Sequence, residues 1–258
     1  MSNPLTKTML KERRGDQLDV GRSSVEDGPL MTRGGVVSAT IIALLIVTAV
    51  AVGVFMIGLQ NPGLAATANI IGAGGVLVTA VLSAIIRKFR NGSFLSTMIL
   101  AIFEGMMVGG FTFGVGTTMV QGVPLSSLII QALIATGALF FGALFLYSSG
   151  MIRVTSKFRS FVMMAVTGAA IGYGINFLIT LFTGNNLLLG GGPLPIIIGI
   201  AAIVLASMSL ITSFHDSDIM IASAAPERTK WAMASSIMVD VVWMYMEIFR
   251  VMALLNRS

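Results

Sequence analysis

The chain has 258 residues, of which 55% are hydrophobic and 10% charged, and its mean hydropathy is +0.93. Soluble domains average about 25% charged residues, so this composition excludes an ordinary soluble protein and indicates a membrane protein. The chain has no cysteine and a single histidine, which excludes disulfides, thiolate metal sites, a cysteine nucleophile and a two-histidine metal site. We therefore expect no cofactor and no tightly bound metal.

The first 35 residues are polar and mixed in charge, and they lack the apolar core of a cleavable signal peptide. We predict two parts: residues 1–35 as a cytoplasmic tail, disordered or loosely helical, and residues 36–258 as a transmembrane domain.

The transmembrane domain is predicted to be all-α, because seven apolar stretches are each long enough to span a bilayer, which takes about 20 helical residues. They lie near Val36–Leu59, Ala65–Ile86, Phe94–Val115, Leu125–Tyr147, Phe161–Phe182, Pro195–Phe214 and Trp231–Leu255. Glycines at helical spacing in two of them are expected to let helices pack closely. These glycines are Gly105 and Gly109 in the third stretch, and Gly168 and Gly172 in the fifth.

The charges between the stretches predict the orientation. The connections after the first, third and fifth stretches carry no charged residue, whereas those after the second, fourth and sixth carry lysines and arginines. By the positive-inside rule, the N-terminus and the even-numbered connections are cytoplasmic, and the protein is a multi-pass protein of the cell membrane. The net charge of +5 is therefore explained by topology, and we expect no nucleic-acid partner.

The candidate functional residues are acids near the end of the chain. Asp216 and Asp218 close the sixth stretch, and Asp240 and Glu247 lie inside the seventh, followed by Arg250. A charged side chain in hydrocarbon costs several kcal/mol, so such residues usually face a polar cavity or a partner and mark an ion or proton site.

Depth along the helices favours one pair. With a rise of about 1.5 Å per residue, the sixth stretch reaches the cytoplasmic edge near Asp216, and Asp240 and Glu247 lie roughly 14 Å and 24 Å deep. Asp240 is therefore the better partner for Asp216, and two such carboxylates in a low dielectric can share one proton. Alternatively, Asp216 and Asp218 are solvated interfacial residues and Glu247 is neutralised by Arg250, which is three residues away.

Two other charged residues each have two alternative roles. Glu104, near the middle of the third stretch, can line the same cavity or hydrogen-bond a neighbouring helix, and Arg87 can cap the acidic pair or only set topology. A hydrolase is not supported: the chain lacks a Gly-x-Ser-x-Gly elbow. Asp216 and Asp240 also lack the Gly-x-Gly-Asp context of aspartyl intramembrane proteases.

Several segments resemble bacterial members of the Bax inhibitor-1/YccA family, and the resemblance covers essentially the whole membrane region. The segments are residues 150–158 (GMIRVTSKF), 191–194 (GGPL), 224–227 (AAPE) and 242–250 (VWMYMEIFR), with the Phe-Glu-Gly of the third stretch and the Ser-Asn-Pro near the N-terminus.

The resemblance implies a seven-helix fold with the last helix central. It also implies a pH-sensitive calcium leak controlled by two acids, which correspond here to Asp216, with Asp218 as the other register, and Asp240. A basic residue that latches the pair corresponds to Arg87. Glu247 departs from this pattern and resembles the glutamate of a Tyr-x-Glu subgroup.

Two functions of different classes are therefore expected. The first is a passive leak for Ca²⁺ or another cation, with lipid, Ca²⁺ and protons as partners. The second is a regulatory protein that binds a membrane protease or a stress-response partner, with the N-terminal tail as the natural contact. A proton-coupled transporter is less well supported, since no inverted repeat is evident.

Overall fold

A computed structural model of the protein describes residues 29–64, 93–120 and 123–257. Within these residues the chain is helical, with no strand beyond one isolated bridge between Leu30 and Pro226. The α-helices are α2 (Arg33–Gln60), α4 (Phe94–Met119), α5 (Leu125–Ser148), α6 (Ser156–Thr183), α7 (Pro193–Ala222) and α8 (Lys230–Leu255), and the short 3₁₀ helices are η1 (Pro62–Leu64), η2 (Leu187–Leu189) and η3 (Glu227–Thr229).

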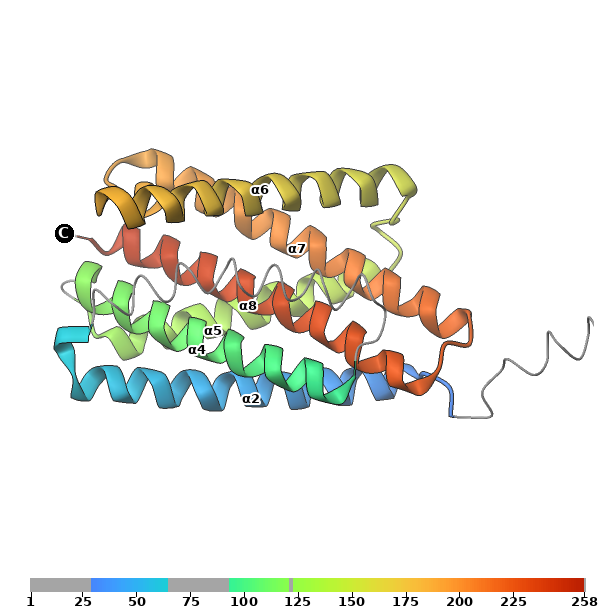
Figure 1. Ribbon diagram of the computed structural model, residues 1–258. Coiled ribbons are helices and arrows are strands. Elements are labelled where there is room, and N and C mark those ends of the chain that lie inside the picture. The colour runs from blue at the N-terminus through green and yellow to red at the C-terminus, as the bar shows by residue number, and fades with distance from the viewer. Residues whose placement is uncertain (1–28, 65–92, 121–122, 258) are drawn as a thin grey trace, which may run out of the picture.

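Helix α8 lies in the centre of the described helices and packs against α2, α4, α5 and α7 (Figure 1). Of its 26 residues 18 are buried, including Asp240, Glu247 and Arg250. A central last helix is what the family resemblance implies. Its charged residues are consequently enclosed by protein rather than presented to lipid.

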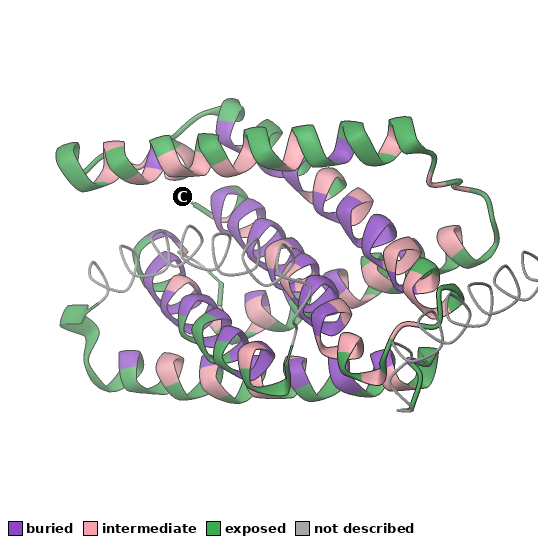
Figure 2. Cartoon of the chain, turned by 45° about the vertical axis from the view of Figure 1, so that its right-hand side comes forward, coloured by how far each residue is buried: buried purple, intermediate pink, exposed green. Residues whose placement is uncertain are grey.

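Five of the described helices, α2, α4, α5, α6 and α7, are long and apolar enough to cross a membrane. Their outward faces carry exposed large apolar side chains, and α6 is exposed along most of its length, in contrast to α8 (Figure 2). Apolar surface of this extent is stable only against lipid, so the protein is a multi-pass membrane protein. The second predicted stretch, Ala65–Ile86, lies outside the described residues.

Helices α2 and α4 interlock through glycines. A Cβ atom on Gly105 would lie 2.7 Å from the carbonyl oxygen of Val47, and one on Gly109 would lie 2.5 Å from that of Ala51. The valines Val50 and Val54 of α2 fill the space left by these glycines. The predicted close packing at Gly105 and Gly109 is thus confirmed. At Gly168 and Gly172 of α6, no described atom lies within 4 Å of where their Cβ atoms would be, so the described helices do not show close packing there.

The side of α7 that faces α8 is rich in small residues. They recur every third or fourth position and are all buried: Gly199, Ala202, Ala206, Ser209 and Ser213. A Cβ atom on Gly199 would lie 2.4 Å from Cγ2 of Val251 and 3.5 Å from Nη2 of Arg250. This face therefore brings the α7 backbone close to α8 and leaves room for the polar side chains of α8.

Several predicted boundaries differ from the structure. Helix α7 continues to Ala222, two turns beyond the predicted end at Phe214, because the apolar residues Ile219, Met220 and Ile221 continue the helical pattern after Asp216 and Asp218. The two acids therefore lie inside a helix and do not close it. Helix α2 begins at Arg33 rather than Val36, so the last residues of the predicted tail belong to the folded domain.

Candidate functional site

The first element of the site is a buried carboxylate held between α7 and α8. Asp240 of α8 is 3% exposed. The hydroxyl of Ser209 donates to its Oδ1 at 2.7 Å, and the hydroxyl of Ser213 donates to its Oδ2 at 2.5 Å. Because the two serines are four residues apart, they lie on the same side of α7 and hold both oxygens of one carboxylate. Each helix thus supplies half of a polar centre within the apolar bundle.

Asp216 lies one turn along α7 from this centre. Its spacing of three residues from Ser213 places it on the same side of the helix, about 4.5 Å further along the axis. Nη2 of Arg159, at the start of α6, lies 3.1 Å from Oδ2 of Asp216, and 27% of the Asp216 side chain is exposed. Asp216 is therefore more accessible than Asp240, and an arginine from a third helix holds it.

The extension of α7 to Ala222 changes the positions of Asp216 and Asp240 relative to each other. Asp216 lies six residues, about 9 Å, before the end of α7, and Asp240 lies about 15 Å after the start of α8. The predicted placement of Asp216 at the helix end was wrong, and the two acids are closer in level than the sequence indicated. The level of Asp240 is given directly by its contacts with Ser209 and Ser213.

Asp218 has different partners from Asp216. Nε of Arg33, at the start of α2, donates to Oδ1 of Asp218 at 3.0 Å. The hydroxyl of Tyr147, near the end of α5, donates to Oδ2 at 2.7 Å. Asp218 consequently joins three helices at the end of the bundle where α7 meets α8, which we call the α7–α8 end.

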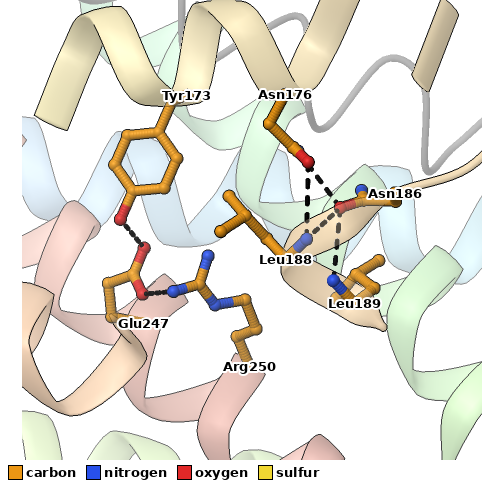
Figure 3. Close-up of polar contacts among 7 residues, drawn as sticks. All are labelled: Tyr173, Asn176, Asn186, Leu188, Leu189, Glu247 and Arg250. Atoms are coloured by element: carbon orange, nitrogen blue, oxygen red, sulfur yellow. Dashed lines mark hydrogen bonds and ion pairs between the residues drawn. The ribbon is translucent and has the colours of Figure 1, made fainter. Parts of the chain in front are cut away.

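Glu247 and Arg250 form a second buried polar group two turns further along α8 (Figure 3). Oε2 of Glu247 lies 2.5 Å from Nη2 of Arg250, an ion pair that fits their spacing of three residues, and the hydroxyl of Tyr173 on α6 donates to Oε1 at 2.6 Å. The guanidinium carbon of Arg250 also lies 5.8 Å from the centre of the Tyr173 ring. Glu247 is therefore held at its own level by Arg250 and Tyr173.

Polar contacts also hold the connection between α6 and α7, near the Glu247–Arg250 ion pair. The side-chain oxygen of Asn176 accepts from the backbone N–H of Leu187 at 3.0 Å, and Asn186 caps the short helix η2 by accepting from Leu188 and Leu189 (Figure 3). Nη1 of Arg257 donates to the carbonyl oxygen of Leu189 at 2.8 Å. These contacts fix the α6–α7 connection against the end of α8.

Glu104 and Arg87 are the remaining candidates. Glu104 is 1% exposed on α4, which packs against α8. The single histidine, His215, lies next to Asp216 on α7 and contacts the Tyr147 ring edge-on, with 6.3 Å between the ring centres. Arg87 lies outside the described residues. Among the described residues, no three or more histidine and carboxylate side chains are grouped as metal ligands.

Sequence reasoning missed the serines. Ser209, Ser213 and Ser217 recur every four residues in an otherwise apolar helix, which was a usable signal for a polar face. Tyr173 and Arg159 gave no such signal, because their contacts span 74 and 57 residues of sequence.

The arrangement provides two polar levels on one face of α8. Asp240 and its serines form one level, Glu247 and Arg250 form the other, and about 10 Å of helix separates them. Trp243 and Met244 lie on this face between the levels, and Met244 is fully buried. Chemically, each level carries a carboxylate that can take up a proton, and an apolar turn separates the two.

Comparison with known proteins gives one family. The family model described as Bax inhibitor 1 like matches residues 3–257, which is nearly the whole chain. Neither the curated proteins nor the solved structures contain a match.

Proposed function

Because the chain belongs to the Bax inhibitor 1-like family, we propose that it lets Ca²⁺ or another cation pass through the membrane passively, under the control of proton binding to Asp216 and Asp240. The observation that carries this proposal is the carboxylate of Asp240, buried between two helices and held by the hydroxyls of Ser209 and Ser213. An ionisable residue at membrane depth marks an ion or proton site by default.

The contacts of Asp240 suit transient binding of a cation. The hydroxyls of Ser209 and Ser213 are neutral, so these two contacts orient the carboxylate without cancelling its charge. Conduction requires binding that is favourable enough for entry and weak enough for release. Asp216, more exposed and one turn away, is suited to receive the cation from solvent.

Arg159 is the natural competitor for that cation. Its guanidinium lies 3.1 Å from Asp216, and nearly half of its side chain is exposed. An arriving divalent cation would displace an exposed ion pair at low cost, since such pairs contribute only about 0–1 kcal/mol. Protonation of Asp216 would also release Arg159, so protons and cations act on the same contact.

The structure represents a closed state under this proposal. Trp243 and Met244 form an apolar turn between Asp240 and the Glu247–Arg250 pair, and apolar constrictions block ions by excluding water. Opening requires α7 or α8 to move so that this turn no longer fills the space between the two polar levels. The α7–α8 end is cytoplasmic in the proposed orientation, with the N-terminus on the same side.

Ion flux into proteoliposomes, measured from pH 5 to pH 8, tests the proposal. We expect a pH-dependent cation flux in the unmodified protein and its loss in the double variant Asp216→Asn plus Asp240→Asn. Glu227→Gln, which removes an acid from η3 at the same end of the bundle, is the control and should leave flux unchanged. If the double variant retains both the flux and its pH dependence, the gating proposal is wrong.

The alternative proposal is a regulatory protein that binds a membrane protease or a stress-response partner without transport. The anchoring of residues 29–33 on the α7–α8 end favours this alternative, because it gives a tail-bound partner a defined position on the protein. Recovery of the same membrane protein with the unmodified chain, combined with the absence of flux at every pH, would favour this function over the leak.

A further inference from the structure

The chain segment that precedes α2 is paired with the turn between α7 and α8. The backbone N–H of Met31 donates to the carbonyl oxygen of Ala225 at 2.9 Å, and that of Glu227 donates to the carbonyl oxygen of Pro29 at 2.8 Å. Leu30 and Pro226 are thereby opposed in an antiparallel bridge. The bridge tolerates Pro226 because both bonds come from its neighbours and no N–H is needed at that position.

Side chains reinforce this pairing. Met31 is buried, with 3% of its surface exposed, so it anchors the segment in the apolar core. The hydroxyl of Thr32 accepts from the backbone N–H of Gly35 at 3.0 Å and caps α2 directly after the bridge. At Gly35 a Cβ atom would lie 3.4 Å from Cδ of Lys230, so the starts of α2 and α8 lie against each other.

Arg33 extends the contact to α7. Its Nε donates to Asp218, whose other oxygen accepts from Tyr147. Asp218 lies two residues from Asp216. One residue before it, Ser217 donates to the carbonyl oxygen of Ser213, which in turn binds Asp240. The segment is thus connected through α7 to the carboxylate at the centre of the proposed site.

The turn that the segment holds is strained. Ala224 has a φ of 52°, in the left-handed region, which residues with a Cβ atom rarely adopt. A strained residue persists only when surrounding contacts hold it in place. Here the next residue, Ala225, donates to Met220 at 3.1 Å and accepts from Met31, so the N-terminal segment supplies one of these contacts.

We propose that residues 29–33 are an N-terminal clamp that keeps the α7–α8 end of the bundle closed over Asp216 and Asp240. The clamp acts through the backbone pairing with Ala225 and Glu227, the buried anchor Met31 and the ion pair between Arg33 and Asp218. This inference rests on the proposed cation leak, and it assigns residues 29–33 the role of regulating that leak.

A reversible cross-link tests the clamp directly. The chain has no cysteine, so Leu30→Cys plus Pro226→Cys creates a single possible disulfide. The flanking bonds make this a pair of the non-hydrogen-bonded type, with Cα atoms roughly 4.5 Å apart, which suits a disulfide. In proteoliposomes we expect the oxidised protein to pass less cation than the unmodified chain, and reduction to restore the flux. Each single cysteine variant should show no response to oxidation.

A second measurement does not depend on flux. Ser217 is buried at the α7–α8 end, so a Ser217→Cys variant reports opening through its rate of reaction with a membrane-impermeant maleimide. Adding Arg33→Gln should raise that rate by up to about fivefold, the factor that corresponds to about 1 kcal/mol for an exposed ion pair. Met31→Ser, which removes the buried anchor, should raise it further. Lys157→Gln, which removes an exposed positive charge near the start of α6 at the same end of the bundle, serves as the control.

The two measurements separate failure of the clamp from failure of the leak. A pH-dependent flux that responds neither to the cross-link nor to Arg33→Gln, with unchanged labelling of the Ser217→Cys variant, overturns the clamp and leaves the leak standing. Faster labelling in Arg33→Gln and Met31→Ser, without flux in any variant, supports the clamp and overturns the leak.

Discussion

Ser213 of α7 and Asp240 of α8 are joined by a hydrogen bond of 2.5 Å in the buried centre of the bundle, and the carbonyl oxygen of Ser213 accepts from Ser217 one turn away. This pair links the two helices on which the proposed gate is built. A hydroxyl donor to a buried carboxylate contributes more than a bond between neutral groups, because the acceptor can carry charge.

The first prediction concerns this bond. Ser213→Ala leaves one oxygen of Asp240 without the Ser213 hydroxyl, and we expect the free energy of unfolding to fall by about 1–3 kcal/mol. Thermal melting of the purified protein at neutral pH measures the change. Ser207→Ala is the control, since Ser207 donates only to the carbonyl oxygen of Ile203 within its own helix. Equal melting temperatures for the two variants would contradict the prediction.

The second prediction concerns the ion pair between Glu247 and Arg250. Removing one partner of a buried pair leaves an uncompensated charge, and we expect Glu247→Gln or Arg250→Gln alone to destabilise the protein by about 3–5 kcal/mol.

The double variant Glu247→Gln plus Arg250→Gln should be less destabilised than the sum of the two single changes. The pair Glu227–Lys230, which has the same spacing but is partly exposed, provides the comparison, and each of its single changes should cost no more than about 1 kcal/mol. Strict additivity at Glu247 and Arg250 would show that the two charges do not interact.

The third prediction concerns the contact between α2 and α4. Gly109→Ala places a Cβ atom 2.5 Å from the carbonyl oxygen of Ala51, so the two helices must separate. The expected cost is about 1–3 kcal/mol. Gly168→Ala on α6 meets no described atom within 4 Å and should instead stabilise its helix by about 0.5–1 kcal/mol. Melting temperatures of the two variants should therefore move in opposite directions.

The fourth prediction concerns the apolar turn between the two polar levels. Met244→Ser introduces a hydroxyl into the proposed constriction, and we expect the cation flux to rise at every pH because water enters more easily. Met238→Ser is the matched control: Met238 is equally buried on α8 but lies on the opposite side from Asp240. A rise of the same size in both variants would attribute the flux to general loosening of the bundle.

Much of the fold could be predicted from the sequence. The apolar stretches predicted the six described helices, and glycine spacing predicted close packing at Gly105 and Gly109, because both depend on short-range periodicity. The end of α7 was misplaced because Asp216 and Asp218 resembled a boundary, although polar residues are tolerated where a helix continues beyond the apolar region.

The candidate site was less accessible to sequence reasoning. The spacing of Glu247 and Arg250 was sufficient to predict their ion pair, since both lie on one helix. The partners of Asp218 come from α2 and α5, and the partner of Asp216 comes from α6. Contacts between helices far apart in the sequence depend on how the bundle packs, and a single sequence carries no direct signal for them.

The two main helix contacts resist displacement to different degrees. Val50 and Val54 of α2 fit into the spaces at Gly105 and Gly109 of α4, so sliding one helix along the other would force branched side chains over backbone. Where α7 meets α8, Val251 of α8 occupies the space at Gly199 in the same way, so packing fixes α7 there. Further along α7, Ser209 and Ser213 bind Asp240, and Asp216 and Asp218 contact Arg159 and Arg33. Packing therefore holds one end of α7, and exchangeable polar contacts hold the other.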